Sequence, residues 1–134
     1  MDTTFEAVQL DQMVAVTGIR VWSICEHHLL PFSCDITIGY LTGKYVIGLS
    51  KMARIAHFHA HRLQCQERLV DGIAADMIRL SESNNVAVIG SGVHLCMSSR
   101  GIRAPHTMVS SAMHGQFKDD PSLRSELLQL TRKD

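Results

Sequence analysis

Met13-Val-Ala-Val-Thr-Gly-Ile-Arg-Val-Trp-Ser-Ile24 is the stretch from which the fold of this chain is best predicted. Its β-branched and aromatic residues are typical of a strand, and residues 34–41 alternate well enough to predict a second strand. A Thr-Gly turn at positions 42 and 43 follows, and residues 45–49 form a short strand-like run. The chain is therefore expected to begin with β-strands.

A helix is predicted after these strands, with Ser50 placed as its N-cap. An apolar stripe at helical spacing most simply faces the core, and it consists of Leu49, Met52, Ala53, Ala56, Ala60 and Leu63. A neighbouring face is cationic and carries Lys51, Arg54, His57 and His61. Two interpretations of that face stay open: it is solvated, or it binds an anion where the helix N-terminus also presents free N–H groups.

The second half of the chain is predicted to contain another helix, further strands and a last helix. Apolar residues from Leu69 to Leu80 mark a second helix, and Asn84-Asn85 turns the chain. A strand starts over 86–89 and is expected to resume after Gly90-Ser91-Gly92. A further strand near 107–117 and a C-terminal helix from Pro121 complete the predicted order of strands, helices, strands and helix.

Thiol and imidazole groups gather at metal-ligand spacing in Cys25-Glu26-His27-His28 and again in His94-Leu95-Cys96. We select Cys25, His28 and Cys96 as ligands, because three protein ligands leave an open position for an activated water at a catalytic zinc. A closed structural site, with Cys34, Cys65 or a second histidine as fourth ligand, stays open as the alternative. Period-two spacing aims His94 and Cys96 to the same side of their strand.

Composition limits the class of protein. The 134 residues are 46% hydrophobic and 19% charged, which suits one domain over residues 1–134. A formal net charge of zero gives no basis for broad binding of nucleic acid or an anionic membrane. The acidic start of the chain and the lack of a long apolar run favour a soluble, cytoplasmic protein. In that reducing compartment Cys34 and Cys65 are expected to be ordinary buried thiols.

Four motifs, in this order and spacing, carry a resemblance to a known family. They are C-E-H-H-L from Cys25, I-G-L-S-K-M-A-R-I from Ile47, R-L-Q-C-Q-E-R-L from Arg62 and H-L-C-M-S-S-R-G-I-R from His94. Together they resemble GTP cyclohydrolase I from about residue 11 almost to the end. The resemblance implies an α+β tunnelling fold (T-fold), an antiparallel sheet with two helices between the strand pairs plus a C-terminal helix. Subunits of such proteins join into an oligomeric barrel.

The resemblance also implies the chemistry of the site. Zinc would be held by Cys25, His28 and Cys96 and would activate water for attack on C8 of the purine. His94 is assigned as the acid that protonates the ring nitrogen, and His27 as a second acid/base or an orienting group. The remaining histidines are interpreted as structural, and they are His57, His59, His61, His106 and His114.

Substrate contacts follow from the same match. Glu67 is placed to accept from guanine, and Gln66 to add an amide contact. The triphosphate clamp is assigned to Ser50, Lys51, Arg54 and Arg100. The implied reaction opens GTP at C8, releases formate and closes to 7,8-dihydroneopterin triphosphate, the first step of folate, tetrahydrobiopterin or deazapurine synthesis. Neighbouring subunits of a pentameric ring or decamer are expected to share each site.

Other functions stay open at this point. Only 24 residues precede Cys25, so the resemblance is to a short form without most of the helical segment typical of the family. A related enzyme acting on dGTP, on the ring-opened intermediate or on another pterin or deazapurine is one alternative. A non-catalytic GTP-binding regulatory ring is a second, and a small structural zinc module is a third.

Overall fold

The computed structural model describes residues 4–6, 12–94 and 107–131. Its elements, in chain order, are β1 Thr4–Glu6, β2 Met13–Cys25, β3 Pro31–Leu41, β4 Tyr45–Ile47, α1 Leu49–Ala60, β5 Leu63–Gln64, α2 Gln66–Ser81, β6 Val86–His94, β7 Met108–Met113, α4 Gln116–Asp119 and α5 Pro121–Leu130. The predicted order is confirmed, because two long strands precede α1 and α2 and two more follow them.

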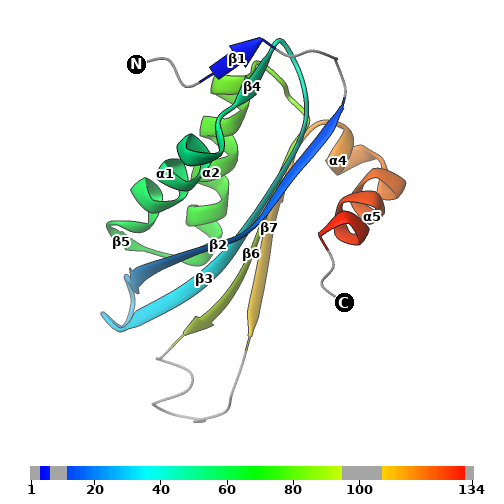
Figure 1. The fold of residues 1–134 in the computed structure, drawn as a ribbon. Coiled ribbons are helices and arrows are strands. Elements are labelled where there is room, and N and C mark those ends of the chain that lie inside the picture. The colour runs from blue at the N-terminus through cyan, green and yellow to red at the C-terminus, as the bar shows by residue number, and fades with distance from the viewer. Residues whose placement is uncertain (1–3, 7–11, 95–106, 132–134) are drawn as a thin grey trace.

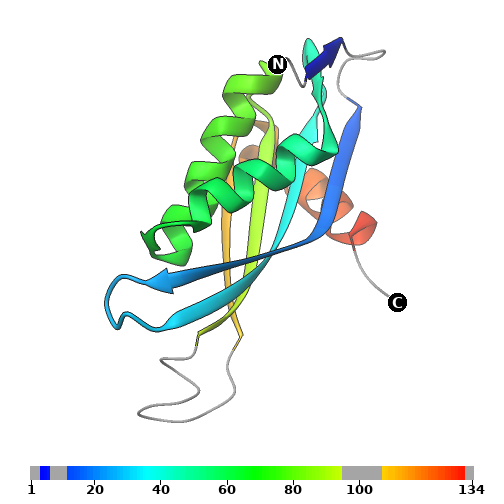
Figure 2. The same ribbon diagram turned by 60° about the vertical axis from the view of Figure 1, so that its left-hand side comes forward.

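The main sheet has the strand order β5-β2-β3-β6-β7, and β1 pairs separately with β4. All pairs in the main sheet are antiparallel except the short β2–β5 contact, which is parallel. Helices α1 and α2 cover one face of the sheet, while α4 and α5 lie on the opposite face (Figure 1). In the turned view, the β2–β3 hairpin extends past the end of α1 (Figure 2). This is the predicted sheet with two helices between its strand pairs.

A bulge in β2 decides which side chains of this strand face the helices. Val16 pairs with Ile38 and Ile19 pairs with Ile36, so Thr17 and Gly18 stand opposite one residue of β3. Gly18 has φ of 77°, a conformation that a residue with a Cβ adopts only at a cost. Even-numbered residues pack on the main core before the bulge and odd-numbered ones after it. The extra residue thereby turns Cys25 inward.

The main core lies between the sheet and helices α1 and α2. Its largest fully buried members come from β3, α1 and α2, and include Phe32, Ile36, Ile38, Tyr40, Met52, Leu69, Ile73 and Met77. Gly90 in β6 allows α2 to approach closely, because a Cβ there would lie 2.9 Å from Sγ of Cys34 and 3.0 Å from Cγ1 of Val70. Within the described residues, no helix combines the length and apolar character needed to cross a membrane.

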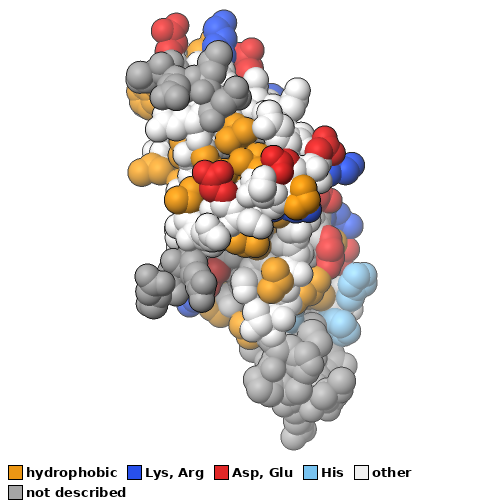
Figure 3. Space-filling view, turned by 90° about the vertical axis from the view of Figure 1, so that its right-hand side faces the viewer, with side chains coloured by type: hydrophobic (Ala, Val, Ile, Leu, Met, Phe, Trp, Pro, Cys, Tyr) orange, Lys and Arg blue, Asp and Glu red, His pale blue; other side chains and the backbone are white. Residues whose placement is uncertain are grey.

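A smaller core lies on the opposite face, beneath α4 and α5. Leu41, Ala87, Phe117 and Leu127 are buried there. Asp120 caps α5 through its side chain, which accepts from the backbone N–H of Ser122 at 3.0 Å. Seen from this side, hydrophobic side chains are scattered among charged ones (Figure 3). Leu128 and Leu130 remain exposed on α5.

Several local expectations about α1 are wrong. Gly48 occupies the N-cap position and Ser50 is the second helical residue, so the serine side chain does not cap the helix. The helix buries Met52, Ile55, Ala56 and Ala60. Leu49 and Leu63, placed in the core stripe from spacing, are 68% and 53% exposed. The helix ends at Ala60, and Leu63 belongs to β5, where the helical spacing no longer applies.

Two expectations about the later strands and one about a cysteine also need correction. Strand β6 runs unbroken through Gly90-Ser91-Gly92, because both neighbouring strands pair with it there. Strand β7 ends at Met113, and the following residues turn through Gly115 into α4. Cys34 is buried as expected, whereas Cys65 is only half-buried at the N-cap of α2.

Candidate active site

The ligand turn, residues 25–28, follows directly from the end of β2. The backbone N–H of Cys25 donates to the carbonyl of Leu30, and the N–H of Leu29 donates to the carbonyl of Cys25, both at 2.9 Å. Leu29 has φ of 56°, in the left-handed region that a side chain disfavours. Strain of this kind persists where surrounding contacts impose it, and here it closes a turn that carries two predicted ligands.

Cys25 and His28 fit a shared metal ion. Sγ of Cys25 lies 3.8 Å from Nδ1 of His28. Two ligands at zinc–sulfur and zinc–nitrogen distances of a tetrahedral site lie roughly 3.6 Å apart, so the pair needs almost no adjustment. Cys96, the third predicted ligand, lies outside the described residues. Within the part of the chain that is described, no group of three or more candidate ligand side chains occurs.

Glu26 fastens the ligand turn to helix α2. Its carboxylate accepts from both terminal nitrogens of Arg68, at 2.7 Å and 3.2 Å. The hydrogen bond from Arg68 lowers the pKa of Glu26, so the pair stays charged at neutral pH. The backbone N–H of Glu26 also donates to the carbonyl of Gln64 in β5 at 3.1 Å. Both contacts hold the turn between the helix and the sheet edge.

His94 ends β6 and is 9% exposed. Its ring stacks on Phe32, with ring centroids 4.4 Å apart and an interplanar angle of 6°. Burial lowers the pKa of His94, and the negative charge of Glu67 acts in the opposite direction. A stacked, buried imidazole next to a carboxylate is a strong candidate for proton transfer.

Gln66, predicted to contact guanine, is buried and makes its hydrogen bonds inside the protein. Its Nε2 donates to the carbonyls of Gly90 and Met108 at 3.0 Å and 2.9 Å and contacts Oγ of Ser110 at 3.0 Å. Its Oε1 lies 2.8 Å from Nε2 of His94. The two carbonyls require the amide nitrogen on their side, so the oxygen faces His94 and accepts the proton of its Nε2.

Gly92 makes room for this arrangement, because a Cβ there would lie 2.2 Å from Oε1 of Gln66. Glu67, the next residue of α2, is exposed in the first helical turn. His27 is also exposed and makes an edge contact with the ring of His28, with centroids 6.5 Å apart. The structure therefore gathers Gln66 and Glu67 beside His94, and His27 lies within the ligand turn.

The predicted phosphate contacts form a separate group at the N-terminal end of α1. Lys51 and Arg54 line a hollow of about 410 Å³ with Phe58, Asp76 and Arg79 among its other walls. The opposite end of α1 leads into β5, which pairs with β2 at Cys25. At 1.5 Å per residue, the helix from Lys51 to Ala60 is roughly 13 Å long. The described residues of one chain thus do not bring the two groups together, and Arg100 lies outside them.

Two features of this site escaped prediction from the sequence. Glu26 lies within the metal motif, yet its pairing with Arg68 depends on how α2 packs and has no local signal. The buried role of Gln66 likewise depends on Gly92, on the neighbouring strand. The glycines of β6 were the available signal, since a glycine inside a strand often marks close approach of another group.

The fold identifies the structural class. The structure superposes on the archaeosine synthase QueF-Like in its apo form with a TM-score of 0.60 and 14% identity, over 75% of this chain and 92% of that one. That likeness, with the sheet and the paired helices, defines a T-fold protein. A family model described as GTP cyclohydrolase I matches residues 1–132. The chain belongs to the GTP cyclohydrolase I family.

Curated relatives agree with this assignment. The chain is 46% identical to GTP cyclohydrolase 1 of Drosophila melanogaster over 121 residues, 90% of this chain and 37% of that protein. It is 44% identical to GTP cyclohydrolase 1 of Mycobacteroides abscessus over 133 residues, 97% of this chain and 65% of the relative. The chain thus spans between about a third and two thirds of the length of these relatives.

Proposed function

We propose that this protein is a zinc-dependent enzyme that hydrolyses GTP at C8, releases formate and forms 7,8-dihydroneopterin triphosphate. The observation that carries the proposal is the convergence of a metal-compatible turn and a supported histidine at one end of the sheet. Ser23, two residues before Cys25, pairs with Phe32, and Phe32 pairs with His94. The register therefore sets His94 two strands across from the ligand-bearing end of β2.

The residues around the turn suit a zinc site. We assign Cys25, His28 and Cys96 as ligands, and thiolate with imidazole is a donor set that zinc accepts. When bound there, the ion supplies Lewis-acid activation of water and polarisation of the purine. Glu26 and Arg68 keep the turn in place, which is the support that a ligand pair needs to hold its geometry.

His94 is proposed to move the proton that ring opening requires. Gln66 accepts a hydrogen bond from Nε2 of the imidazole and so orients the ring. Stacking on Phe32 fixes the plane of the ring. His27, exposed beside the turn, is proposed as the second acid/base group. These roles need only short movements of protons between positioned groups.

Substrate recognition is proposed to use two regions that come from different subunits: the first turn of α2 and the N-terminal half of α1. Glu67 presents a carboxylate to the N1–H and exocyclic amino group of guanine. Lys51, Arg54, Ser50 and Arg100 bind the triphosphate, and Gln66 contributes through His94. Because the α1 cations lie far from Cys25 in one chain, a neighbouring copy must supply them. We therefore propose a homo-oligomer, a pentameric ring or decamer, with its sites between subunits.

The cytoplasm is the proposed location, since none of the described cysteines Cys25, Cys34 and Cys65 forms a disulfide, as a reducing compartment favours. To test the function, the zinc-loaded protein is incubated with GTP and, separately, with dGTP. Formate and the fluorescence of the oxidised pterin are then measured. Both signals from GTP support the proposal. Signals only from dGTP would show a different substrate, and GTP binding without either signal would show a binding ring.

A further inference from the structure

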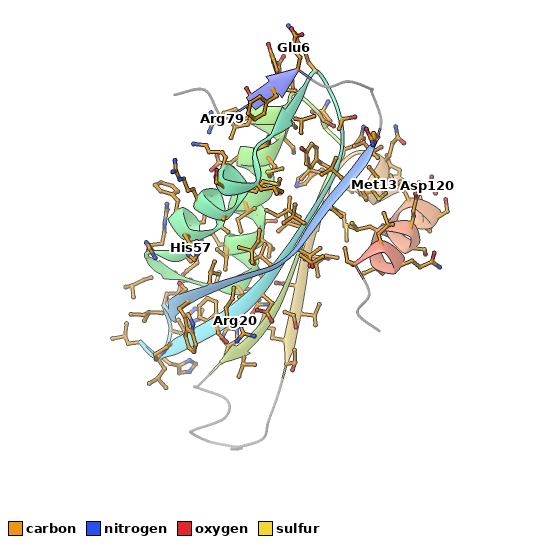
Figure 4. The ribbon with its side chains drawn as sticks, in the orientation of Figure 1. Glu6, Met13, Arg20, His57, Arg79 and Asp120 are labelled. Carbon is orange, nitrogen blue, oxygen red and sulfur yellow. The ribbon has the colours of Figure 1, made fainter. Side chains whose placement is uncertain are left out.

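Helix α1 ends at Ala60, within the histidine-rich run His57-Phe58-His59-Ala60-His61, and His61 is its C-cap. The histidines of this run have different surroundings. His59 points inward, with Nε2 at 2.7 Å from Oδ2 of Asp76 in α2. His57 and His61 are exposed, and their ring centroids lie 6.0 Å apart with an interplanar angle of 49°. Figure 4 labels His57 on α1, on the outer side of the helix relative to the sheet.

The two exposed rings are available to a ligand. Within the described residues, each makes the ring contact with the other and no side-chain hydrogen bond or ion pair. His59 contrasts with them, because its contact with Asp76 already occupies one ring nitrogen. The backbone N–H of His61 donates to the carbonyl of His57 at 3.0 Å, which fixes the helical spacing of the pair.

We propose that His57 and His61 form a binding site for a divalent transition metal ion, separate from the ligand turn at Cys25 and His28. Two histidines four residues apart lie on one face of a helix and can share one ion. Two imidazoles bound to one tetrahedral zinc have ring centroids roughly 5 Å apart. The observed separation needs only a small rotation of two exposed side chains.

The donor set selects the class of ion. Imidazole nitrogen suits Zn²⁺, Ni²⁺ and Cu²⁺, whereas Mg²⁺ and Ca²⁺ require oxygen ligands. Arg54 lies one turn before His57, and Arg62 follows His61 with its guanidinium 5.3 Å from the centre of the Phe58 ring. These positive charges oppose a cation that is held by charge alone. The pair therefore favours ions that form strong bonds to nitrogen, with water completing their coordination.

The test uses untagged protein loaded with a single equivalent of zinc per chain, freed of excess metal and checked for its zinc content. Ni²⁺ is titrated into wild type, His57→Gln, His61→Gln and the matched control His114→Gln, with binding followed by calorimetry. We expect one Ni²⁺ equivalent in wild type and in the control, and roughly tenfold or greater loss of affinity in each variant of the pair. Circular dichroism checks that all four proteins are folded. A Cu²⁺ titration followed by electron paramagnetic resonance reads nitrogen ligation directly.

Each outcome decides the proposal. Loss of the Ni²⁺ equivalent in both variants of the pair, with nitrogen ligation of Cu²⁺ in wild type, supports it. Unchanged Ni²⁺ affinity in both variants overturns it, as does an equal loss in His114→Gln. Mg²⁺ serves as the negative control. Tight Mg²⁺ binding that depends on His57 would contradict the assignment of the site to transition metal ions. The readouts do not depend on turnover of GTP, so the proposed function is tested separately.

Discussion

Oε1 of Gln66 and Nε2 of His94 lie 2.8 Å apart, and this contact determines which nitrogen of the histidine carries the proton. The amide of Gln66 cannot turn over, because its nitrogen already donates to the carbonyls of Gly90 and Met108. An acceptor therefore faces His94, and the neutral ring holds its proton on Nε2. Gln66, predicted to contact guanine, thus positions a second residue of the predicted site.

Replacing Gln66 with leucine removes that acceptor while keeping a similar volume. We expect His94 to lose its single tautomer, and turnover of GTP to fall roughly a hundredfold through misplacement of the ring. Long-range nitrogen–proton NMR of histidine-labelled protein reads the tautomer, and a kinetic assay reads turnover. Gln129→Leu, at an exposed position of α5, is the control. An unchanged Nε2–H signal in Gln66→Leu would contradict this role.

Gly18 should matter for stability although a Cβ there meets no atom within 4 Å. Its φ of 77° makes alanine unfavourable, so Gly18→Ala is expected to cost about 1–2 kcal/mol in the free energy of unfolding. Urea denaturation measures this cost. Thr17→Ala, in the same bulge, is expected to stay within about 0.5 kcal/mol of wild type. Equal effects of the two substitutions would argue against the conformational explanation.

The separation of Arg54 from Cys25 along α1 leads to a subunit-mixing prediction. Arg54→Ala and His94→Ala should each be nearly inactive as single variants. Random co-assembly of equal amounts should restore roughly a quarter of wild-type activity, because some interfaces then combine two intact halves. Co-expression with two different tags, followed by tandem purification and assay, gives the measurement. Mixed oligomers without any activity would place both groups in one chain.

Cys34 should resist modification in the folded protein. Burial raises the pKa of its thiol to about 12, and only the thiolate reacts. The unfolded chain loses this proton from about pH 9, so the free energy of unfolding should fall as pH rises between these two values. Iodoacetamide labelling with mass spectrometry is expected to modify Cys65 and spare Cys34. Cys34→Ala should show a weaker loss of stability in that pH range.

The spacing of apolar residues along the longer segments was a good guide to the fold. Residues 13–24 and the helical spacing from Leu69 to Leu80 predicted β2 and α2 almost to their ends, because both have strongly patterned burial. Helix ends were less predictable. Ser50 has the side chain of an N-cap, yet Gly48 occupies that position and the helix starts at Leu49, two residues before the predicted first helical residue, Lys51.

The site was only partly predictable for a similar reason. Spacing alone selected Cys25 and His28 as predicted ligands, and the structure places them in one turn with Sγ and Nδ1 3.8 Å apart. The inward orientation of Cys25 depends on the bulge at Gly18, and the orientation of His94 depends on Gln66, 28 residues away in sequence. Such contacts across strands and helices leave no local pattern, apart from the glycines that make room for them.

The most direct measurement of the proposed function uses GTP labelled with carbon-14 at C8. The zinc-loaded oligomer is incubated with this substrate, and labelled formate is separated from the remaining nucleotide and counted. We predict that wild type and His114→Ala release the label as formate with a pterin product, while His94→Ala does not. Tight binding of GTP with the label retained in the nucleotide would contradict the assignment of this protein as a GTP-opening enzyme.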